Sequence, residues 1–597
     1  MPLLEHFPNL VSMFFARAAQ KGDSPFLWAK KEGTWRSIGW SETADQVCSL
    51  AAGLKAIGLN PGERVMLVSE NRPEWCIADL AIMTAGCVTV PAYTTNTERD
   101  HQHILDDSGA RAVIVSTQKL ARPLLPAAIR SSNCEHVIGI EALPGGQSGN
   151  VGFHDWKSLI AAHAPDVAAC AATAAKVTRD DLACLIYTSG TGGAPRGVMQ
   201  HHGAILHNVE GCVEVIDEDF GVGEEVFLSF LPPSHAYEHS GGQFFPIGIG
   251  AQIYYSEGLE KLASNIEEVA PTMMIVVPRL FEVLRQRILK NVEKQGRLAG
   301  YMMKRALEIG ARDYAGTRSL WDRPMDLLLD RLFRPKVSAK FGGRVKAMVA
   351  GGAPLNPDVG IFFHSIGLTV LQGYGQTESG PVISCNRPKA GVKMDTVGPP
   401  LRNTEVRIAQ DGEILVRGEL VMKGYWRNPA QTEKALVGGW LHTGDVGHID
   451  EAGRIVITDR KKDLIVNDKG DNVSPQKVEG MLTLQPEILQ AMVVGDRRPY
   501  LVGVLVPDPE WTAEWAAAAD KPRDPAVLRD DPDYHRALSA AVQRVNADLS
   551  VIEKVRRFIV ADAPFSTENE QLTPSIKIRR HVIRAAYGER LDGLYKK

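Results

Sequence analysis

Hydrophobic and polar positions alternate in two different rhythms along the chain, and the change comes near residue 400. Before that point, short apolar runs rich in β-branched residues are separated by segments with helical spacing; these runs include residues 64–69, 110–115, 273–277 and 346–350. Such alternation is typical of parallel or mixed sheets covered by helices. The pattern therefore predicts an α/β fold whose large N-terminal domain contains stacked sheets with flanking helices.

From Val406 onward the apolar runs become shorter, and Asp-Gly and Gly-Gly pairs separate them. They predict the strands of a β-rich subdomain at about residues 400–460, with runs at residues 406–408, 413–417 and 454–458. A charged segment, residues 459–463, follows between two strand-like runs. We expect a boundary there, with an N-terminal domain of residues 1–460 and a small, mobile α+β C-terminal domain of residues 461–597.

Two apolar stretches need a structural interpretation before function is considered. The first twenty residues contain Glu5, Pro8 and Asn9 and lack a basic leader, so they predict an amphipathic first helix rather than a signal peptide. The longest uncharged stretch, residues 80–97, contains Gly86 and Pro91. It predicts a helix followed by a buried strand, and nothing in the sequence predicts a membrane span.

Composition and charge argue against some classes of binding partner, nucleic acid above all. The chain has 67 Lys and Arg against 71 Asp and Glu, a formal charge of −4, and 44% of its 597 residues are hydrophobic. This is a globular composition without the excess positive charge that a nucleic acid would require. The eight cysteines contain no C-x-x-C pair, which is typical of reduced, packed thiols in a cytoplasmic protein. The sequence leaves open a peripheral association with the inner face of a membrane.

The most informative motif is YTSGTGGAPRGV, residues 187–198, which directly follows a buried apolar run. Its glycines allow backbone N–H groups to converge, its hydroxyls can donate to phosphate oxygens, and Arg196 supplies a fixed positive charge. The spacing is not that of a Walker loop. Composition alone predicts a phosphate cradle, and a flexible linker is disfavoured because the motif directly follows a buried run.

Three further segments carry weaker signals. In YGQTE, residues 374–378, the aromatic ring can stack on a purine, the hydroxyl can reach a phosphate and the carboxylate can hold Mg²⁺. In TGD, residues 443–445, a carboxylate on a tight turn can accept hydrogen bonds from a ribose diol. In AGGAP, residues 350–354, the glycines allow a flat base to approach the backbone. YGQTE alone is equally consistent with a strand-end turn that carries a surface Glu, and TGD alone is a common turn that gains weight only from the other motifs.

A competing motif, His235-Ala-Tyr-Glu238-His239, has the H-x-x-E-H pattern of inverted zinc proteases. Ser234 could cap a helix that places both imidazoles on one face. We expect Gly241 and Gly242 to stop that helix almost at once, which disfavours a zinc hydrolase.

Taken in order, these motifs resemble those of the adenylate-forming superfamily, which comprises acyl-CoA synthetases, luciferases and peptide-synthetase adenylation domains. The loop at residues 187–198 is similar to the family's YTSGTTGxPKGV, and the YGQTE and TGD segments have family counterparts. The hinge segment, residues 459–467, and the lysine segment LTPSIKIRR, residues 572–580, complete the series. Within the superfamily, the chain looks most like long-chain fatty-acid CoA ligases.

The resemblance implies a role for each matched residue. The residues that would bind phosphate and nucleotide are Thr188, Ser189, Gly190, Thr191, Gly192, Gly193, Gly352, Ala353, Tyr374, Gly375, Thr377, Asp445 and Arg460. Thr191 and Glu378 would hold Mg²⁺, Tyr374 would cover the adenine, and Asp445 and Arg460 would bind the ribose. Thr377 would contact the α-phosphate. Lys577 and Arg196 would stabilise phosphate charge, Lys462 would be the hinge residue, and His235 and Tyr237 would line the carboxylate-substrate pocket.

The resemblance implies an ATP-dependent, AMP-forming ligase that joins a fatty acid to coenzyme A through an acyl-AMP intermediate. Two residues depart from the family pattern: Gly192 replaces a Thr, and Arg196 replaces the usual Lys. Both departures retain phosphate affinity in principle. Three alternatives stay open: an acyl-AMP ligase that delivers to a carrier protein, a zinc hydrolase at His235, Glu238 and His239, and a nucleotide-binding protein without catalysis.

Overall fold

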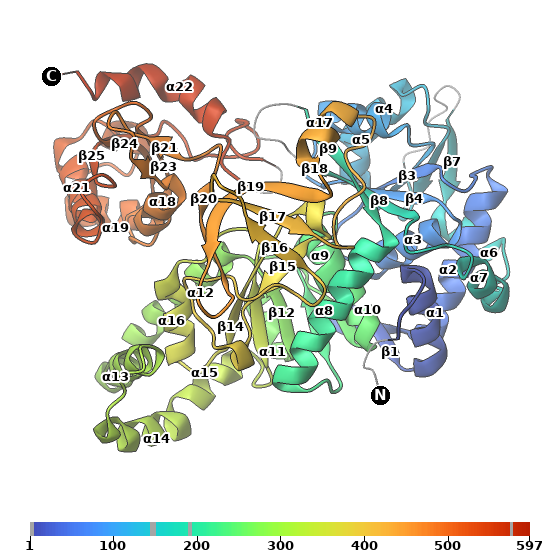
Figure 1. Cartoon of the computed structure of the whole chain (residues 1–597), viewed down its shortest axis with the longest axis horizontal. Coiled ribbons are helices and arrows are strands. Elements are labelled where there is room, and N and C mark those ends of the chain that lie inside the picture. The colour runs from blue at the N-terminus through green and yellow to red at the C-terminus, as the bar shows by residue number, and fades with distance from the viewer. Residues whose placement is uncertain (1–4, 144–150, 189–193, 574–576, 597) are drawn as a thin grey trace.

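Two large sheets form the body of the computed structural model, which describes residues 5–143, 151–188, 194–573 and 577–596 (Figure 1). The first sheet has eight strands in the order β15-β14-β13-β12-β10-β11-β1-β2. Its strands are β1 (Pro25–Lys31), β2 (Thr34–Gly39), β10 (Val226–Ser229), β11 (Gln252–Tyr255), β12 (Met273–Val276), β13 (Ala347–Ala350), β14 (Val370–Gly375) and β15 (Val382–Cys385). From β1 to β14 neighbouring strands run parallel, so their carboxyl ends lie at one edge of this sheet.

The second sheet has seven strands in the order β7-β6-β5-β3-β4-β8-β9. They are β3 (Arg64–Val68), β4 (Val88–Pro91), β5 (Ala112–Val115), β6 (His136–Gly139), β7 (Gly152–Asp155), β8 (Leu182–Thr188) and β9 (Arg196–His201). All pairs are parallel except β8 with β9, which is antiparallel. Both sheets combine the short apolar runs that the sequence predicts as buried strands.

Helices fill the space between and around these sheets. The helices of the first half are α1 (Leu10–Lys21), α2 (Trp40–Ala56), α3 (Pro73–Thr84), α4 (Glu98–Ser108), α5 (Gln118–Arg130), α6 (Trp156–Ala161), α7 (Val167–Ala174), α8 (His202–Phe220), α9 (Ala236–Glu238), η1 (His239–Phe244) and α10 (Phe245–Ile249). A single core cluster joins Phe227 of one sheet and Ile114 of the other to Ile77 and Leu206 of the helices. Apolar side chains buried on both sides of the helices therefore hold the sheets together.

The middle of the chain adds a helical arm to the eight-stranded sheet. Its elements are α11 (Leu262–Val269), α12 (Pro278–Lys294), α13 (Arg297–Tyr314), η2 (Leu320–Asp322), α14 (Arg323–Leu332), α15 (Arg334–Lys340) and α16 (Pro357–Ser365). In Figure 1, α13 and α14 project from the lower left of the body, at the far side from α1 to α7. The arm joins the body through a second core cluster that includes Phe281 and Phe363.

The predicted β-rich subdomain is a five-stranded antiparallel sheet next to the body. It contains β16 (Glu405–Ile408), β17 (Glu413–Arg417), β18 (Leu436–Val437), β19 (Trp440–Ile449) and β20 (Ile455–Arg460), and it is preceded or interrupted by η3 (Thr377–Ser379), η4 (Pro388–Ala390) and α17 (Pro429–Ala435). The charged segment at residues 459–463 begins inside a strand. Asp459 and Arg460 belong to β20, because they pair with Val446 and Asp445 of β19.

The C-terminal part packs helices against a three-stranded sheet and a two-stranded sheet. Its elements are β21 (Ile465–Val466), β22 (Asn472–Val473), α18 (Pro475–Thr483), β23 (Ile488–Val494), β24 (Leu501–Pro507), α19 (Pro509–Ala518), α20 (Pro525–Leu528), α21 (Pro532–Ala547), β25 (Val555–Val560) and α22 (Arg580–Gly593). Arg580 at the start of α22 forms an ion pair of 2.5 Å with the buried Glu479 of α18. This part has its own apolar core, built on both faces of the three-stranded sheet.

The α/β fold, the β-rich subdomain and the α+β C-terminal part confirm the predicted fold class. The expected first helix is α1, which begins after Asn9, whose side chain accepts a hydrogen bond from the Ser12 N–H at 2.8 Å. All eight cysteines are free thiols, six buried and two half-buried. Within the described ranges, we find no helical stretch with the length and apolarity that crossing a bilayer demands.

Candidate active site

A cavity of about 1360 Å³ opens where the eight-stranded sheet, the five-stranded sheet and the C-terminal part meet. The carboxyl ends of β13 and β14 supply Gly352 and Tyr374, and β19 and β20 supply Asp445 and Arg460. Lys577 comes from the C-terminal part. Ligand sites of α/β proteins typically lie at the carboxyl ends of parallel strands, because loops and free backbone groups converge there. This cavity is therefore the candidate active site.

The predicted phosphate loop is described only at its two flanks. Ser189, Gly190, Thr191, Gly192 and Gly193 lie outside the described residues. The flanking strands β8 and β9 form an antiparallel ladder in which Thr188 pairs with Arg196, and both residues line the cavity. The prediction of a buried strand leading into this loop is confirmed for residues 182–188.

Arg196 has an environment that suits an anion. Its guanidinium lies 4.3 Å from the centre of the Tyr425 ring, and its Nη1 donates to the Gln431 side chain at 3.3 Å. The Nε of Arg196 is buried and has no hydrogen-bond partner within the described part of the chain. A buried donor without a partner is costly, so a ligand oxygen at this point would be stabilised.

Tyr374, Asp445 and Arg460 form a second polar group that lines the cavity. The Tyr374 hydroxyl donates to Asp445 Oδ2 at 2.7 Å, and Arg460 Nε lies 3.2 Å from Asp445 Oδ1. Burial raises the pKa of Asp445, and the positive charge of Arg460 opposes that rise. Gly375 is required beside Tyr374, because a Cβ there would lie 1.7 Å from the Pro381 carbonyl oxygen.

Glu378 is held by a residue that no motif indicated. The Tyr425 hydroxyl donates to Glu378 Oε1 at 2.8 Å, and the same ring carries the Arg196 guanidinium on its face. Tyr425 therefore connects the cation and the carboxylate of the candidate site. The neighbouring Thr377 lines the cavity, and its carbonyl oxygen accepts from the Gln200 side chain at 2.6 Å.

Lys577 extends into the cavity from the C-terminal part. Its side chain is open to the cavity, but protein surrounds the cavity on most sides. Desolvation in this enclosure and, to a smaller extent, the charge of the nearby Arg460 lower the pKa of Lys577 to about 8, while Glu378 and Asp445 act in the opposite direction. The nearby carboxylates therefore balance the positive charge of the ammonium group only in part, and an anionic ligand would stabilise it.

The inner end of the cavity is apolar. Its walls come from α8, η1, α10 and β12 to β15, and they are formed by Cys212, Val215, Ile216, Gly241, Phe245, Met273, Ile275, Val349, Leu371, Val382 and Cys385. His235 and Tyr237 line the same cavity, as predicted. Burial, with a smaller effect of Lys577, lowers the pKa of His235 to about 3, so its imidazole is neutral.

The competing zinc motif does not form a metal site. His235 is the N-cap of α9, and its Nδ1 accepts a hydrogen bond from the Tyr237 N–H at 3.2 Å. His239 Nε2 instead contacts Asp79 Oδ2 at 2.9 Å in the core. Among the residues that the structure describes, no group of three His, Cys, Asp or Glu side chains could hold a metal ion.

The expected reason for rejecting that motif was wrong. Gly241 and Gly242 do not stop the helix, because the chain continues through the π-helical η1 into α10. A π-helical turn tolerates these glycines, and Gly242 lies against Glu238, where a Cβ would be 2.4 Å from the carboxylate.

The structure brings together most of the predicted site residues. The cavity is lined by Thr188, Arg196, His235, Tyr237, Gly352, Tyr374, Gly375, Thr377, Glu378, Asp445, Arg460, Lys462 and Lys577. Ala353 is exposed and does not line it, because the chain turns outward after Gly352. Sequence reasoning missed Tyr425 and the apolar wall, whose residues lie in separate segments that carry no motif.

Comparison with known proteins agrees with this geometry. A family model described as AMP-binding enzyme matches residues 14–426, and one described as AMP-binding enzyme C-terminal domain matches residues 462–597. The chain is 32% identical to the long-chain-fatty-acid--CoA ligase FadD15 of Mycobacterium bovis, over 99% of this chain and 97% of that protein. It is 30% identical to the human long-chain-fatty-acid--CoA ligase 6, over 99% and 88%.

Solved structures share the fold. The adenylation domain of a carboxylate reductase from Mycobacterium chelonae superimposes with a TM-score of 0.76 at 21% identity, covering 100% of this chain and 92% of that one. An anthranilate CoA ligase in complex with anthranoyl-AMP gives a TM-score of 0.72 at 19% identity, covering 99% and 98%. With a family model that matches more than two thirds of its length and relatives matched almost end to end, the chain belongs to the AMP-binding enzyme family.

Proposed function

We propose that the protein is an AMP-forming ligase that activates a long-chain fatty acid and transfers the acyl group to coenzyme A. The observation that carries this proposal is the division of one cavity into two ends. The polar end presents Arg196, Tyr374, Asp445 and Lys577, and the inner end is apolar. A fatty acid has the same division, with one anionic carboxylate and a long hydrocarbon chain.

The first half-reaction needs positioning and charge stabilisation more than covalent help from the protein. The fatty carboxylate attacks the α-phosphorus of ATP, the bond to the β-phosphate oxygen breaks, and acyl-AMP and pyrophosphate form. Asp445 would accept hydrogen bonds from the ribose hydroxyls, and the Tyr374 ring would cover the adenine. Arg196 and Lys577 would neutralise the phosphate charge that grows as pyrophosphate departs.

Mg²⁺ suits the carboxylate of Glu378, although the second expected ligand, Thr191, lies outside the described residues. Glu378 lines the cavity and uses Oε1 for Tyr425; Oε2 has no hydrogen-bond partner within the described ranges. Protein Mg²⁺ sites commonly use one or two carboxylates together with substrate phosphates, and the ion would neutralise phosphate charge.

In the second half-reaction the thiol of coenzyme A attacks the acyl carbon, and AMP leaves. The C-terminal domain that presents Lys577 would rotate so that the thiol can enter. We place the pivot at Lys462 and the domain boundary between residues 460 and 461. Two observations support this placement: β20 ends at Arg460, and the second family match begins at residue 462.

A panel of carboxylic acids with ATP tests the proposal as a whole. Each acid is scored for pyrophosphate, AMP and CoA thioester. We expect all three products with long-chain acids. AMP formation only when a carrier protein replaces coenzyme A would favour the carrier-protein alternative, and the absence of pyrophosphate with every acid would favour a binding protein without catalysis. Peripheral association with a membrane stays a proposal.

We predict that Lys577→Ala reduces pyrophosphate release by on the order of a hundredfold or more, because the charge opposite the leaving group is lost. Thioester formation from preformed acyl-AMP should change only slightly. Both half-reactions are measured on one preparation. Lys469→Ala, an exposed lysine of the same C-terminal part outside the cavity, is the control and should retain both activities. Equal losses in both half-reactions of Lys577→Ala would contradict the assignment.

The lowered pKa of Lys577, about 8, makes a second prediction for the wild-type enzyme. The ammonium form carries the charge and predominates below that pH, so the rate of pyrophosphate release should fall as the pH rises through about 8. In Lys577→Arg the guanidinium stays charged, so a slower reaction without this fall is expected. A wild-type rate that stays constant up to pH values well above 9 would refute this role of the lysine, since roughly nine in ten groups would then be neutral.

We predict that Gly241→Leu discriminates against long acids. A Cβ at Gly241 would make an ordinary contact of 3.4 Å with Ile275 Cδ1, so the backbone accepts it, while the rest of the leucine would enter the apolar end of the cavity. We expect kcat/KM to fall about tenfold or more for palmitate, because each displaced methylene contributes about 0.8 kcal/mol, and to change little for a short acid. Gly588→Leu, where a Cβ meets nothing within 4 Å, is the control. Equal effects on both acids would place the acyl chain elsewhere.

We predict that Lys462→Pro uncouples the two steps. Proline fixes φ near −65° and removes the N–H, which restricts the orientation of the C-terminal domain. Pyrophosphate release should survive within about tenfold while thioester formation falls about a hundredfold or more. Lys462→Ala separates backbone from side-chain effects, because it removes the same side chain but keeps the backbone free. Parallel losses of both steps in a protein with an unchanged melting temperature would show that Lys462 is not the pivot.

A further inference from the structure

Helix α14 of the projecting arm has its burial pattern reversed. The carboxylates of Asp322, in the preceding turn η2, and of Asp326 are buried, at 6% and 8% exposure, whereas Leu327 is 68% exposed and Leu332 is 53% exposed. Globular proteins ordinarily bury leucine and expose aspartate, because an unpaired charge is costly to remove from water. Leu329 is the one leucine of this helix that is fully buried in the core. Burial of leucines alone therefore does not set the orientation of the helix.

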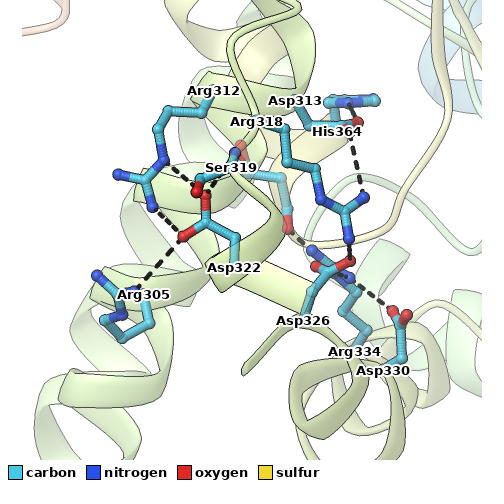
Figure 2. Close-up of polar contacts among 11 residues, drawn as sticks. Arg305, Arg312, Asp313, Arg318, Ser319, Asp322, Asp326, Asp330, Arg334 and His364 are labelled. Carbon is cyan, nitrogen blue, oxygen red and sulfur yellow. Dashed lines mark hydrogen bonds and ion pairs between the residues drawn. The ribbon is translucent and has the colours of Figure 1, made fainter. Parts of the chain in front are cut away.

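Arginines from three neighbouring segments fix that orientation (Figure 2). Arg312 of α13 donates to both carboxylate oxygens of Asp322, at 3.0 and 2.7 Å. Arg318 donates to Asp326 at 2.6 Å, and Arg334 of α15 lies 2.8 Å from the other oxygen of Asp326. Paired, charge-assisted hydrogen bonds of this kind hold a fixed geometry. The pairs turn the acidic face of α14 toward the protein.

The opposite face is consequently apolar and open to solvent. Trp321 is 91% exposed and Leu320 is 71% exposed. We define the α14 face as five exposed apolar side chains of α14 and the turn before it: Leu320, Trp321, Leu327, Leu328 and Leu332. Leu327, Leu328 and Leu332 share one side of α14 by the helical period, and Leu320 and Trp321 lie in the turn η2 that directly precedes it. Contiguous apolar strips on a soluble protein mark an interaction surface.

Positive charge surrounds the strip. Residues 317–340 contain six Lys and Arg against three Asp, in a chain whose net charge is −4. Each Asp already pairs with an arginine inside the network, whereas Arg323, Arg331 and Lys336 are exposed and form no ion pair within the described ranges. Apolar side chains with a rim of free cations are suited to a surface that offers hydrocarbon beneath negative charge.

We propose that the α14 face docks the protein peripherally on an anionic phospholipid bilayer. Leu320, Trp321 and Leu327 would enter the region between headgroups and acyl chains, and the surrounding arginines would contact lipid phosphates. A second copy of this chain fits less well, because it would bring the same positive rim against the first. Helix α14 lies at the outer end of the projecting arm, away from the sheets of the body (Figure 1). The proposal does not rest on the ligase activity.

Vesicle sedimentation tests the proposal with the full-length protein and without ATP or coenzyme A. One set of vesicles contains phosphatidylcholine alone, and the other contains equal parts of phosphatidylcholine and phosphatidylglycerol. We expect binding of the wild type to the anionic vesicles. The triple variant Trp321→Ser/Leu327→Ser/Leu328→Ser should bind about tenfold or more weakly, since apolar burial contributes directly to interfacial affinity. These side chains are exposed, so the melting temperature should not fall.

A charge variant and a matched control sharpen the result. Arg323→Glu/Arg331→Glu should lose the preference for anionic over neutral vesicles. Val437→Ser/Val551→Ser removes apolar side chains that are likewise exposed, on the five-stranded sheet and in the C-terminal part, and should bind as the wild type does. Wild-type affinity of the triple variant for anionic vesicles would overturn the proposal.

The oligomeric state in solution tests the alternative that a second copy of the chain, and not a membrane, covers the α14 face. Sedimentation velocity of the wild type and the triple variant is measured in the absence of lipid. We expect the two proteins to sediment alike. A wild-type dimer that becomes monomeric in the triple variant, with no binding of either protein to vesicles, would show that the α14 face joins two copies of the chain and would overturn the membrane assignment.

Discussion

The site depends on one partly desolvated cation, the ammonium group of Lys577, which is open to a cavity that protein surrounds on most sides and whose pKa the nearby Arg460 also lowers. Burial and the neighbouring guanidinium both oppose its charge, and the carboxylates of Glu378 and Asp445 compensate only in part, which is why its pKa falls to about 8. Phosphate oxygens would supply the missing counter-charge. In the proposed reaction that counter-charge leaves with pyrophosphate, so the position of Lys577 is stabilised before adenylation and loses support afterwards. In the proposed reaction, this loss of counter-charge would favour the proposed rotation of the C-terminal domain at the step that needs it.

The division of the cavity follows from how the sheets are built. Parallel strands β10 to β14 end at one edge, where Gly352 and Gly375 leave the backbone accessible. The same strands are buried along their length, so their side chains toward α8 and η1 are apolar, as Ile275 and Leu371 show. A ligand at the strand ends therefore meets polar groups first and apolar walls deeper inside. One fold element supplies both ends of a site for an amphipathic acid.

Much of this arrangement is predictable from sequence because it depends on local patterns. The run before Thr188 is apolar over consecutive positions, which predicts a buried strand, and the structure confirms it. Tyr425 is different. It contacts Glu378 and Arg196 only because β9 and the segment before α17 meet in space, through an isolated bridge between Val198 and Tyr425. No spacing along the chain encodes that meeting. Ala353 shows the converse, because its segment matches a family pattern while the backbone carries it out of the cavity.

The zinc motif and the α14 face show the same limit for polar residues. A motif such as H-x-x-E-H predicts a metal site only if both imidazoles are available to a metal, and here the His235 Nδ1 accepts a hydrogen bond from the Tyr237 N–H at the start of α9. His239 meets Asp79, which lies far away in the sequence. In α14 the periodicity of leucines predicts which residues share a face, but it assigns that face to the core. Arg312 and Arg318 instead hold the aspartates of the other face toward the protein, where a buried carboxylate without a partner would be costly, and only Leu329 of the leucines is buried with them. The direction in which an amphipathic helix faces is thus decided by its partners, and only the structure shows them.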